Sequence, residues 1–116
     1  MNDRPAYKDH PLWTQAMSLT RDGYALAEQL RENDPALALR VKKAAVAVPA
    51  QVAGALGADA GAPDRREHLE EARGALAALA RHARSCSLPG SDALASRAEL
   101  FDRSVLFELG AGERFF

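Results

Sequence analysis

Four stretches of the chain space their apolar residues three and four positions apart, and proline or glycine separates each stretch from the next. In the first stretch, Leu12, Leu19 and Leu26 recur every seven residues. Such spacing lines apolar side chains along one side of an α-helix, which then has to be buried against another element. The pattern predicts helices at about 11–31, 35–57, 64–87 and 91–109, followed by a C-terminal tail at 110–116.

The connections between these expected helices are short, for example GADAGAP at 57–63 and LPGS at 88–91. Short connections make consecutive helices antiparallel neighbours. β-Branched residues are few, with five valines, two threonines and no isoleucine, which argues against a sheet. We therefore expect an all-α fold: one domain over residues 1–116, arranged as an antiparallel up-down-up-down four-helix bundle.

Alanine is the commonest residue, with 25 alanines against 15 leucines in 116 residues. Alanine favours helix but buries little apolar area. A core made by this chain alone therefore gains less than the 47% content of hydrophobic residues suggests. The helices must pack closely or bury surface against other subunits.

Net charge and cysteine content indicate which partners and which cellular compartment to expect. The formal net charge of −1 does not mark a nucleic-acid or membrane binder. Cys86 is the single cysteine, which excludes an internal disulfide and suits a reducing compartment. No apolar stretch is long enough to span a bilayer, and the N-terminal residues lack the apolar core of a signal peptide. We expect a soluble, cytoplasmic protein without membrane contact.

Pro49 lies inside the second expected helix, in RVKKAAVAVPAQVAGAL at 40–56. Proline removes a backbone donor and crowds the carbonyl of Ala45, which destabilises a helix interior by ~3 kcal/mol. We expect a kink there, with freed carbonyls near Ala45, and Gln51 close by needs a hydrogen-bond partner. Two interpretations stay open. The bend wraps the helix around its own core, or it shapes a subunit interface.

Patterns for catalysis or metal binding are weak. His82 and Cys86 are four residues apart on an expected helix, but a metal site needs two more ligands and Cys86 continues an apolar heptad. A core thiol beside a surface histidine is the favoured interpretation. Glu67, Glu70 and Glu71 are best explained as solvated carboxylates that complement a helix dipole. Without a nucleophile elbow, Walker loop or dinucleotide fingerprint, we expect no enzyme, metal or cofactor.

Two segments, 35–58 and 72–91, carry basic residues and no acid. If these segments adjoin, they form a basic face that the net charge hides and that could hold phosphates. The alternative is a solvated face whose charges pair with acids elsewhere in the fold. No aromatic residue is interleaved with the bases, so base stacking is not supported. The candidate nucleic-acid contacts are Arg40, Lys42, Lys43, Arg73, Arg81 and Arg84.

Three segments carry recognisable signatures: YKDHPLWTQAM at 7–17, the proline-containing stretch at 40–56, and ARGALAALA at 72–80. In this order they resemble the signatures of a bacterial four-helix-bundle family encoded in intervening sequences of large-subunit ribosomal RNA genes. The resemblance covers most of residues 7–86. Its motif and structural positions are Tyr7, Lys8, Asp9, Leu12, Trp13, Ala16, Ala44, Ala45, Pro49, Gln51 and Gly74.

Several positions depart from the polar residues of that family. Gln51 stands where relatives have asparagine, and small or apolar residues replace a serine and several glutamates. If those polar residues serve a site in relatives, the site is mostly erased here. The departing positions are Ala47, Gln51, Gly54, Ala55, Ala75, Ala78 and Ala80.

The resemblance implies a homo-oligomer of four-helix bundles, and similar proteins form a five-membered ring. One related branch, the retroelement accessory variability protein, binds a reverse transcriptase and nucleic acid, but that branch is strongly basic. Two hypotheses follow. The first is a non-enzymatic, self-assembling scaffold or adaptor, expected to be a homopentamer. The second is an accessory module that binds RNA or a ribonucleoprotein through the basic face.

Overall fold

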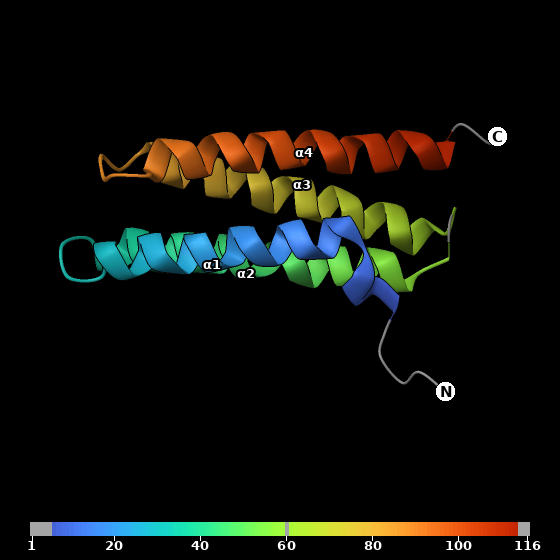
Figure 1. The fold of residues 1–116 in the computed structure, drawn as a ribbon, viewed down its shortest axis with the longest axis horizontal. Helices are drawn as coiled ribbons and strands as arrows, with labels where there is room; N and C mark the ends of the chain where they lie inside the picture. Colours follow the sequence, from blue (N-terminus) through green and yellow to red (C-terminus); the bar gives the residue numbers. More distant parts are fainter. Residues whose placement is uncertain (1–5, 60, 114–116) are drawn as a thin grey trace.

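The computed structural model describes the backbone of residues 6–59 and 61–113, and the side chains of residues 8–59 and 61–110. It shows a short 3₁₀ helix, η1, and four α-helices with no strand in this described part (Figure 1). The elements are η1 (Ala6–Asp9), α1 (Pro11–Leu30), α2 (Pro35–Gly57), α3 (Pro63–Arg84) and α4 (Ser91–Glu113).

The four α-helices run along the long axis of the molecule, and the connections between them alternate between its two ends (Figure 1). α2 packs against both α1 and α3, and α4 packs against α3. Contact between α1 and α4 is less extensive, so the bundle closes least tightly along that seam. The predicted up-down-up-down four-helix bundle is confirmed.

Local sequence signals start the helices where they were expected. The Asp34 carboxylate accepts a hydrogen bond from the Leu37 amide at 3.1 Å, which caps α2, and Pro35 occupies its first turn. α1 begins in the same way, because the Nδ1 atom of His10 accepts from the Leu12 amide at 3.1 Å. These caps satisfy amides that have no partner inside the helix.

Two predicted helix ends are wrong. α3 stops at Arg84 rather than 87, because Ser85 closes the last turn with a hydrogen bond from its hydroxyl to the His82 carbonyl at 2.7 Å. α4 continues to Glu113, so residues 110–113 are helix and not tail. Glycine ends a helix when it adopts a positive φ, and Gly110 does not. The remainder of the predicted tail, 114–116, lies outside the described residues.

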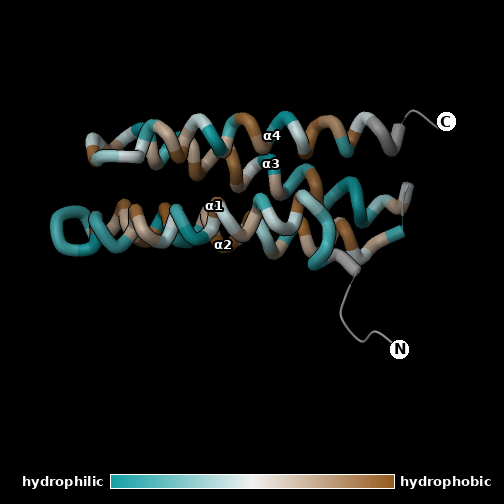
Figure 2. The backbone as a smooth tube through the Cα atoms, in the orientation of Figure 1, coloured by the Kyte–Doolittle hydropathy of each residue, from teal (hydrophilic) through white to brown (hydrophobic). Residues whose placement is uncertain are grey.

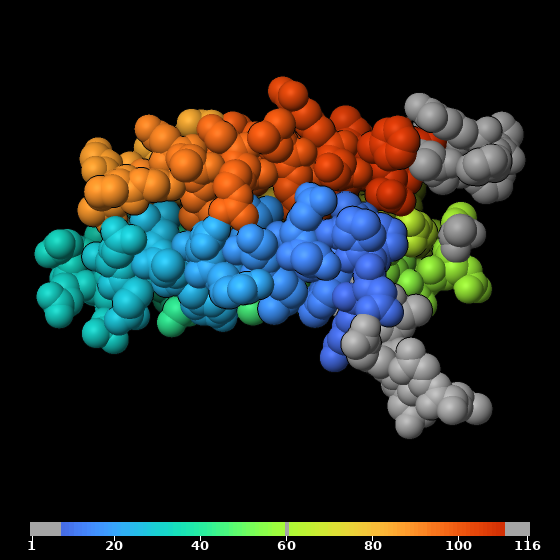
Figure 3. Space-filling model, viewed as in Figure 1, coloured from blue at the N-terminus to red at the C-terminus, as the bar shows by residue number. Residues whose placement is uncertain are grey.

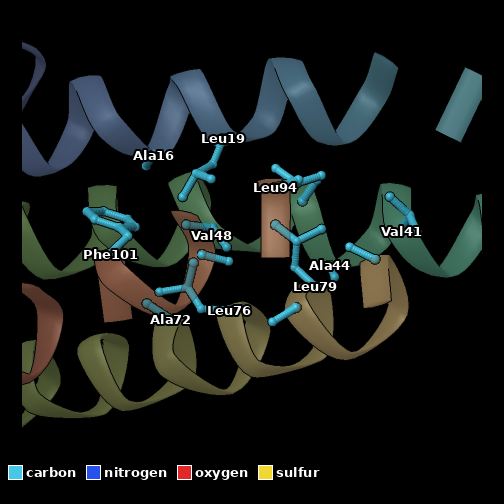
Figure 4. Close-up of a cluster of buried hydrophobic side chains, with 14 of the residues drawn as sticks. Ala16, Leu19, Val41, Ala44, Val48, Ala72, Leu76, Leu79, Leu94 and Phe101 are labelled. Carbon is cyan, nitrogen blue, oxygen red and sulfur yellow. The ribbon is translucent and has the colours of Figure 1, made fainter. Parts of the chain in front are cut away.

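The core runs the length of the bundle between the four helices. Figure 4 shows part of it in close-up. Its largest fully buried side chains are Leu69, Leu76, Leu79, Val41, Val48, Val52 and Val105. Alanines such as Ala16 and Ala72 are completely buried between them, so the helices do pack closely. Figure 2 shows apolar and polar residues alternating along the helices, with a hydrophilic connection between α1 and α2. In the described residues, no helix has the length and apolar character that crossing a membrane requires.

α2 continues without a break through Pro49. Because proline has no N–H, the Ala45 carbonyl lacks its usual donor from four residues further along the helix. The Thr20 hydroxyl of α1 lies 3.0 Å from that carbonyl and 2.9 Å from the Ala16 carbonyl of its own helix. Thr20 is buried, so this hydroxyl provides a partner for an acceptor that water does not reach. The expected kink at Pro49 stays a prediction.

α1 and α2 come close together beside this hydrogen bond. A Cβ atom added to Gly23 would lie 2.6 Å from the Cβ of Ala45, a separation that carbon atoms do not tolerate. Gly23 is therefore required by the close approach of the two helices, and not by a turn. The proline of α2 thus sits where α1 has both a hydroxyl and a glycine.

Candidate basic surface and polar junctions

α2 and α3 pack against each other along much of their length, so the two acid-free segments adjoin. Two of the six candidate arginines and lysines nevertheless turn towards α4. The Arg73 guanidinium makes a two-point contact with Asp102, at 2.9 Å and 3.2 Å, and Arg84 pairs with Glu99. The hydrogen bond to Asp102 raises the pKa of Arg73 above its already high ordinary value. For these two residues the alternative interpretation, pairing with acids elsewhere, is the better one.

Lys42 turns in the opposite direction, towards α1. Its ammonium nitrogen lies 5.6 Å from the centre of the Tyr24 ring, within the range of a cation–π contact. Tyr24 is 40% exposed, so this contact lies at the surface. Lys42 remains available to solvent but is held at the α1–α2 seam.

Two of the remaining candidates, Arg40 and Arg81, lie near His82, where the first half of α2 meets the end of α3. Burial lowers the pKa of His82, and the positive charges of Arg81 and Arg40 lower it further. Lys43 is exposed and lies one helical turn from Arg40. Among the described residues, no acid forms an ion pair with Arg40, Lys43 or Arg81. We call Arg40, Lys43, Arg81 and His82 the basic surface.

A groove between α3 and α4 extends this surface, and the sequence patterns did not indicate it. Arg81 on α3 and Arg103 on α4 both line it. Arg103 is surrounded by acids in the sequence, so the search for acid-free segments passed over it. The helix pairing alone brings it near Arg81. The other lining residues are Leu76, Ala77, Ala80, Arg84, Ala98, Glu99 and Asp102.

The side chain of Gln51 has the hydrogen-bond partner that its position in α2 requires. Its Oε1 atom lies 2.7 Å from Nδ1 of His68 on α3. A Cβ atom added to Gly54 would lie within 2.8 Å of the His68 ring, so Gly54 makes room for that ring. Two of the departures from the family pattern thus form one structural junction between α2 and α3.

Arg65 forms a second junction one turn away from His68. One guanidinium nitrogen donates to the Ala55 carbonyl at 3.2 Å, and another contacts the Glu108 carboxylate at 3.2 Å. The Arg65 and Glu108 side chains are mostly buried. This arginine therefore joins α2, α3 and α4 at the end of the bundle where α2 terminates.

The other motif residues contribute to packing or are exposed. Ala44 and Ala45 are buried in the core, whereas Gly74 is exposed and an added Cβ would meet nothing within 4 Å. Trp13 is half-buried and Asp9 is exposed. The side chain of Tyr7 lies outside the described residues. The alanines at the other departing positions are buried or half-buried and supply no polar group: Ala47, Ala55, Ala75, Ala78 and Ala80.

Cys86 does not continue the heptad, because α3 ends before it. Its thiol lies 3.1 Å from the Ala83 carbonyl and packs partly against the core. Within the ranges whose side chains are described, no group of three or more His, Cys, Asp or Glu residues is placed to hold a metal ion.

Comparisons of the chain with protein-family models, with curated proteins and with solved structures return no match. The described residues of the chain form a basic surface and two structural junctions, and they leave several large apolar side chains exposed.

Proposed function

We propose that this protein is a non-enzymatic, cytoplasmic scaffold or adaptor that assembles as a homo-oligomer. The observation that carries the proposal is the outer face of α2. Leu39 and Val46 are 59% and 46% exposed, although the opposite face of the same helix forms part of the core. A helix that is apolar on both sides is normally buried on both sides.

The outer face of α2 has a regular spacing of its own. Residues 39, 43, 46, 50, 53 and 57 follow one another at intervals of four and three. Lys43 is the one charged residue among them, and the last three are Ala50, Ala53 and Gly57. This is the spacing of a helix–helix seam, and its small residues allow a second helix to approach closely.

α4 adds a second exposed apolar surface. Leu100, Leu106 and Phe107 are 58%, 49% and 60% exposed. Side chains of this size on two helices of a small domain are typical of surfaces that bind another protein. The resemblance of residues 7–86 to the family of ribosomal RNA intervening sequences supports the same proposal, and a pentamer is the assembly that it favours.

Light scattering on a gel-filtration column tests the proposal. We expect a molar mass several times the 12.5 kDa of one chain at micromolar concentration, and five times that mass for a pentamer. The mass should fall on dilution if the exposed surfaces hold the copies together. A chain that remains monomeric across the concentration range would contradict self-assembly.

The second candidate function is binding of RNA or a ribonucleoprotein, such as a complex with a reverse transcriptase. The observation that favours it is the basic surface, where Arg40 and Arg81 lie near His82 and Lys43 lies one helical turn from Arg40. Among the described residues, none of these three has an ion-pairing acid. Arg73 and Arg84 contribute less, because acids of α4 already neutralise them.

A salt series distinguishes this function from simple self-assembly. Binding of a single-stranded RNA should weaken as salt rises, and Arg40→Glu or Arg81→Glu should reduce both affinity and salt slope. Arg21→Glu is the matched control, because it makes the same charge change on the exposed side of α1. Equal effects of all three variants, or no binding at low salt, would remove the basic surface as an RNA site.

A further inference from the structure

We propose that the groove between α3 and α4 binds a small organic phosphate, that is, a phosphate group attached to a compact apolar body. The groove has a volume of about 580 Å³. Pockets that hold small molecules commonly have volumes of about 300–1,000 Å³. The proposal goes beyond the functions proposed above, because it requires neither a second copy of the chain nor RNA.

Small side chains on both helices leave the space for this groove. α3 packs against α4, and Figure 3 shows α4 forming one long margin of the molecule. Leu76 and Ala80 of α3 and Ala98 of α4 line the groove and are almost completely buried, so they form its floor. Ala77 also lines the groove but is exposed. Because an alanine side chain is a single methyl group, these positions leave room that larger residues would fill.

Four charged side chains at or beside the groove compensate one another in two pairs. The two carboxylate oxygens of Asp102 accept hydrogen bonds from the Arg73 guanidinium, at 2.9 Å and 3.2 Å. Glu99 pairs with Arg84. The two acids that line the groove are therefore already engaged by arginines, which reduces their repulsion of an anion.

Arg81 and Arg103 supply the positive charge that these pairs leave over. Arg81 lines the groove from α3 and Arg103 lines it from α4, so the two guanidinium groups border one space from different helices. Within the described ranges, no acid forms an ion pair with either arginine, and both residues are exposed. A guanidinium group matches the geometry of phosphate oxygens. A phosphate monoester carries a charge of about −1.5 to −2 at pH 7, which two arginines balance.

The floor of the groove indicates what the phosphate is attached to. Its residues are leucine and alanine, so an apolar group that lies on it loses contact with water without leaving a polar atom unpaired. Phenyl phosphate combines the charged group with a compact apolar ring. It should bind more tightly than inorganic phosphate, which lacks the ring, and than phenol, which lacks the charge.

Isothermal titration calorimetry with these three compounds at low salt tests the site on the full chain. Arg81→Gln and Arg103→Gln should each weaken phenyl phosphate binding by about tenfold or more, because each removes hydrogen bonds to a charged group. Arg21→Gln is the matched control on the exposed side of α1 and should change the affinity little. Ala77→Leu keeps every charge but fills part of the groove, so it should weaken phenyl phosphate more than inorganic phosphate.

Other results would overturn the proposal. Absence of phenyl phosphate binding at millimolar concentration would remove the site. If Arg103→Gln has no more effect than Arg21→Gln, or if Arg40→Gln weakens binding as much as Arg81→Gln and Arg103→Gln do, the groove is not the site. Equal binding of phenyl phosphate and inorganic phosphate, unchanged by Ala77→Leu, would show that exposed charges alone attract the anion.

Two controls keep these results interpretable. A glutamine variant that loses its helical circular dichroism is replaced by lysine at the same position. Lysine keeps the charge but lacks the planar guanidinium group, so phenyl phosphate binding should still weaken. Light scattering on the same samples reports self-assembly separately, so failure of the phosphate site and failure of the proposed scaffold function are distinguishable.

Discussion

α1 and α3 differ from α2 and α4 in what they present to solvent. The outer faces of α1 and α3 are polar, with exposed residues such as Arg21, Glu28, Glu70 and Arg81. The described residues of α3 include no exposed large apolar side chain, and Tyr24 of α1 lies beneath Lys42. α2 and α4 instead carry apolar residues on both sides.

Packing within one chain accounts for the apolar side chains of α1 and α3, but not for all of those on α2 and α4. A four-helix bundle needs one apolar side per helix, and α1 and α3 have that and no more. α2 and α4 in addition expose large apolar side chains, which include Leu39, Val46, Leu100 and Leu106. In a chain whose core relies on alanine, the extra apolar area is concentrated on two helices rather than spread over the surface.

The largest expected effect on the free energy of unfolding comes from comparing substitutions on the two sides of α2. Leu37 is 8% exposed and Leu39 is 59% exposed, two residues apart on one helix. Leu37→Ala should lower the free energy of unfolding by about 2–5 kcal/mol, because it opens a cavity in the core. Leu39→Ala should change it by less than about 0.5 kcal/mol in dilute protein. Urea denaturation measures both.

Measuring Leu37→Ala and Leu39→Ala at several protein concentrations extends this comparison. If the outer side of α2 is an interface, Leu39→Ala should reduce only the part of the stability that rises with protein concentration. Equal losses from Leu37→Ala and Leu39→Ala in dilute protein would show that the two sides of α2 do not differ as described.

A smaller effect should come from the hydrogen bond that joins α1 to α2 at Pro49. Thr20→Val should lower the free energy of unfolding by about 1–3 kcal/mol, because the buried Ala45 carbonyl loses its donor. In a Pro49→Ala background the loss should be smaller, because residue 49 then has its own N–H to donate. A double-mutant cycle by urea denaturation measures the coupling. Additive losses would mean that Thr20 does not compensate for the proline.

The smallest effect concerns His82, on the polar side of α3. Its pKa is lowered in the folded protein below its ordinary value of 6.5, so below that pH the unfolded chain binds more protons than the folded one. Stability should therefore be lost as pH falls from about 6.5 towards the folded pKa. The loss should be small, because His82 is only half-buried and is a single titrating group. His82→Gln should remove it in thermal unfolding at several pH values, whereas a pH response equal to that of the wild type would contradict it.

Most of the fold could be predicted from local patterns. The Asp34–Pro35 cap and the core stripe of Val41, Val48 and Val52 depend on residues within one helix, so spacing alone identifies them. The ends of α3 and α4 were missed for a related reason. They depend on the Ser85 hydroxyl and the φ angle of Gly110, which spacing does not report.

The candidate site was less predictable, because charge pairing depends on which helices are neighbours. Arg73 and Arg40 look equivalent in the sequence, yet Asp102 neutralises one of them and no described acid pairs with the other. The position of Gln51 indicated that its side chain needs a hydrogen-bond partner. It did not indicate which residue, because His68 is 17 residues away on another helix. Arg103 was missed altogether.

By itself, the sequence determined four helices, their order, their inner sides and the presence of a proline in the second. Those features follow from backbone chemistry and from spacing within a helix, which act over a few residues. Only the tertiary structure decided that the Thr20 hydroxyl bonds to the Ala45 carbonyl, that Gly54 makes room for His68, and that Arg73 and Arg84 pair with acids of α4. These outcomes depend on side chains far apart in the chain, whose contacts exist only after the helices have packed.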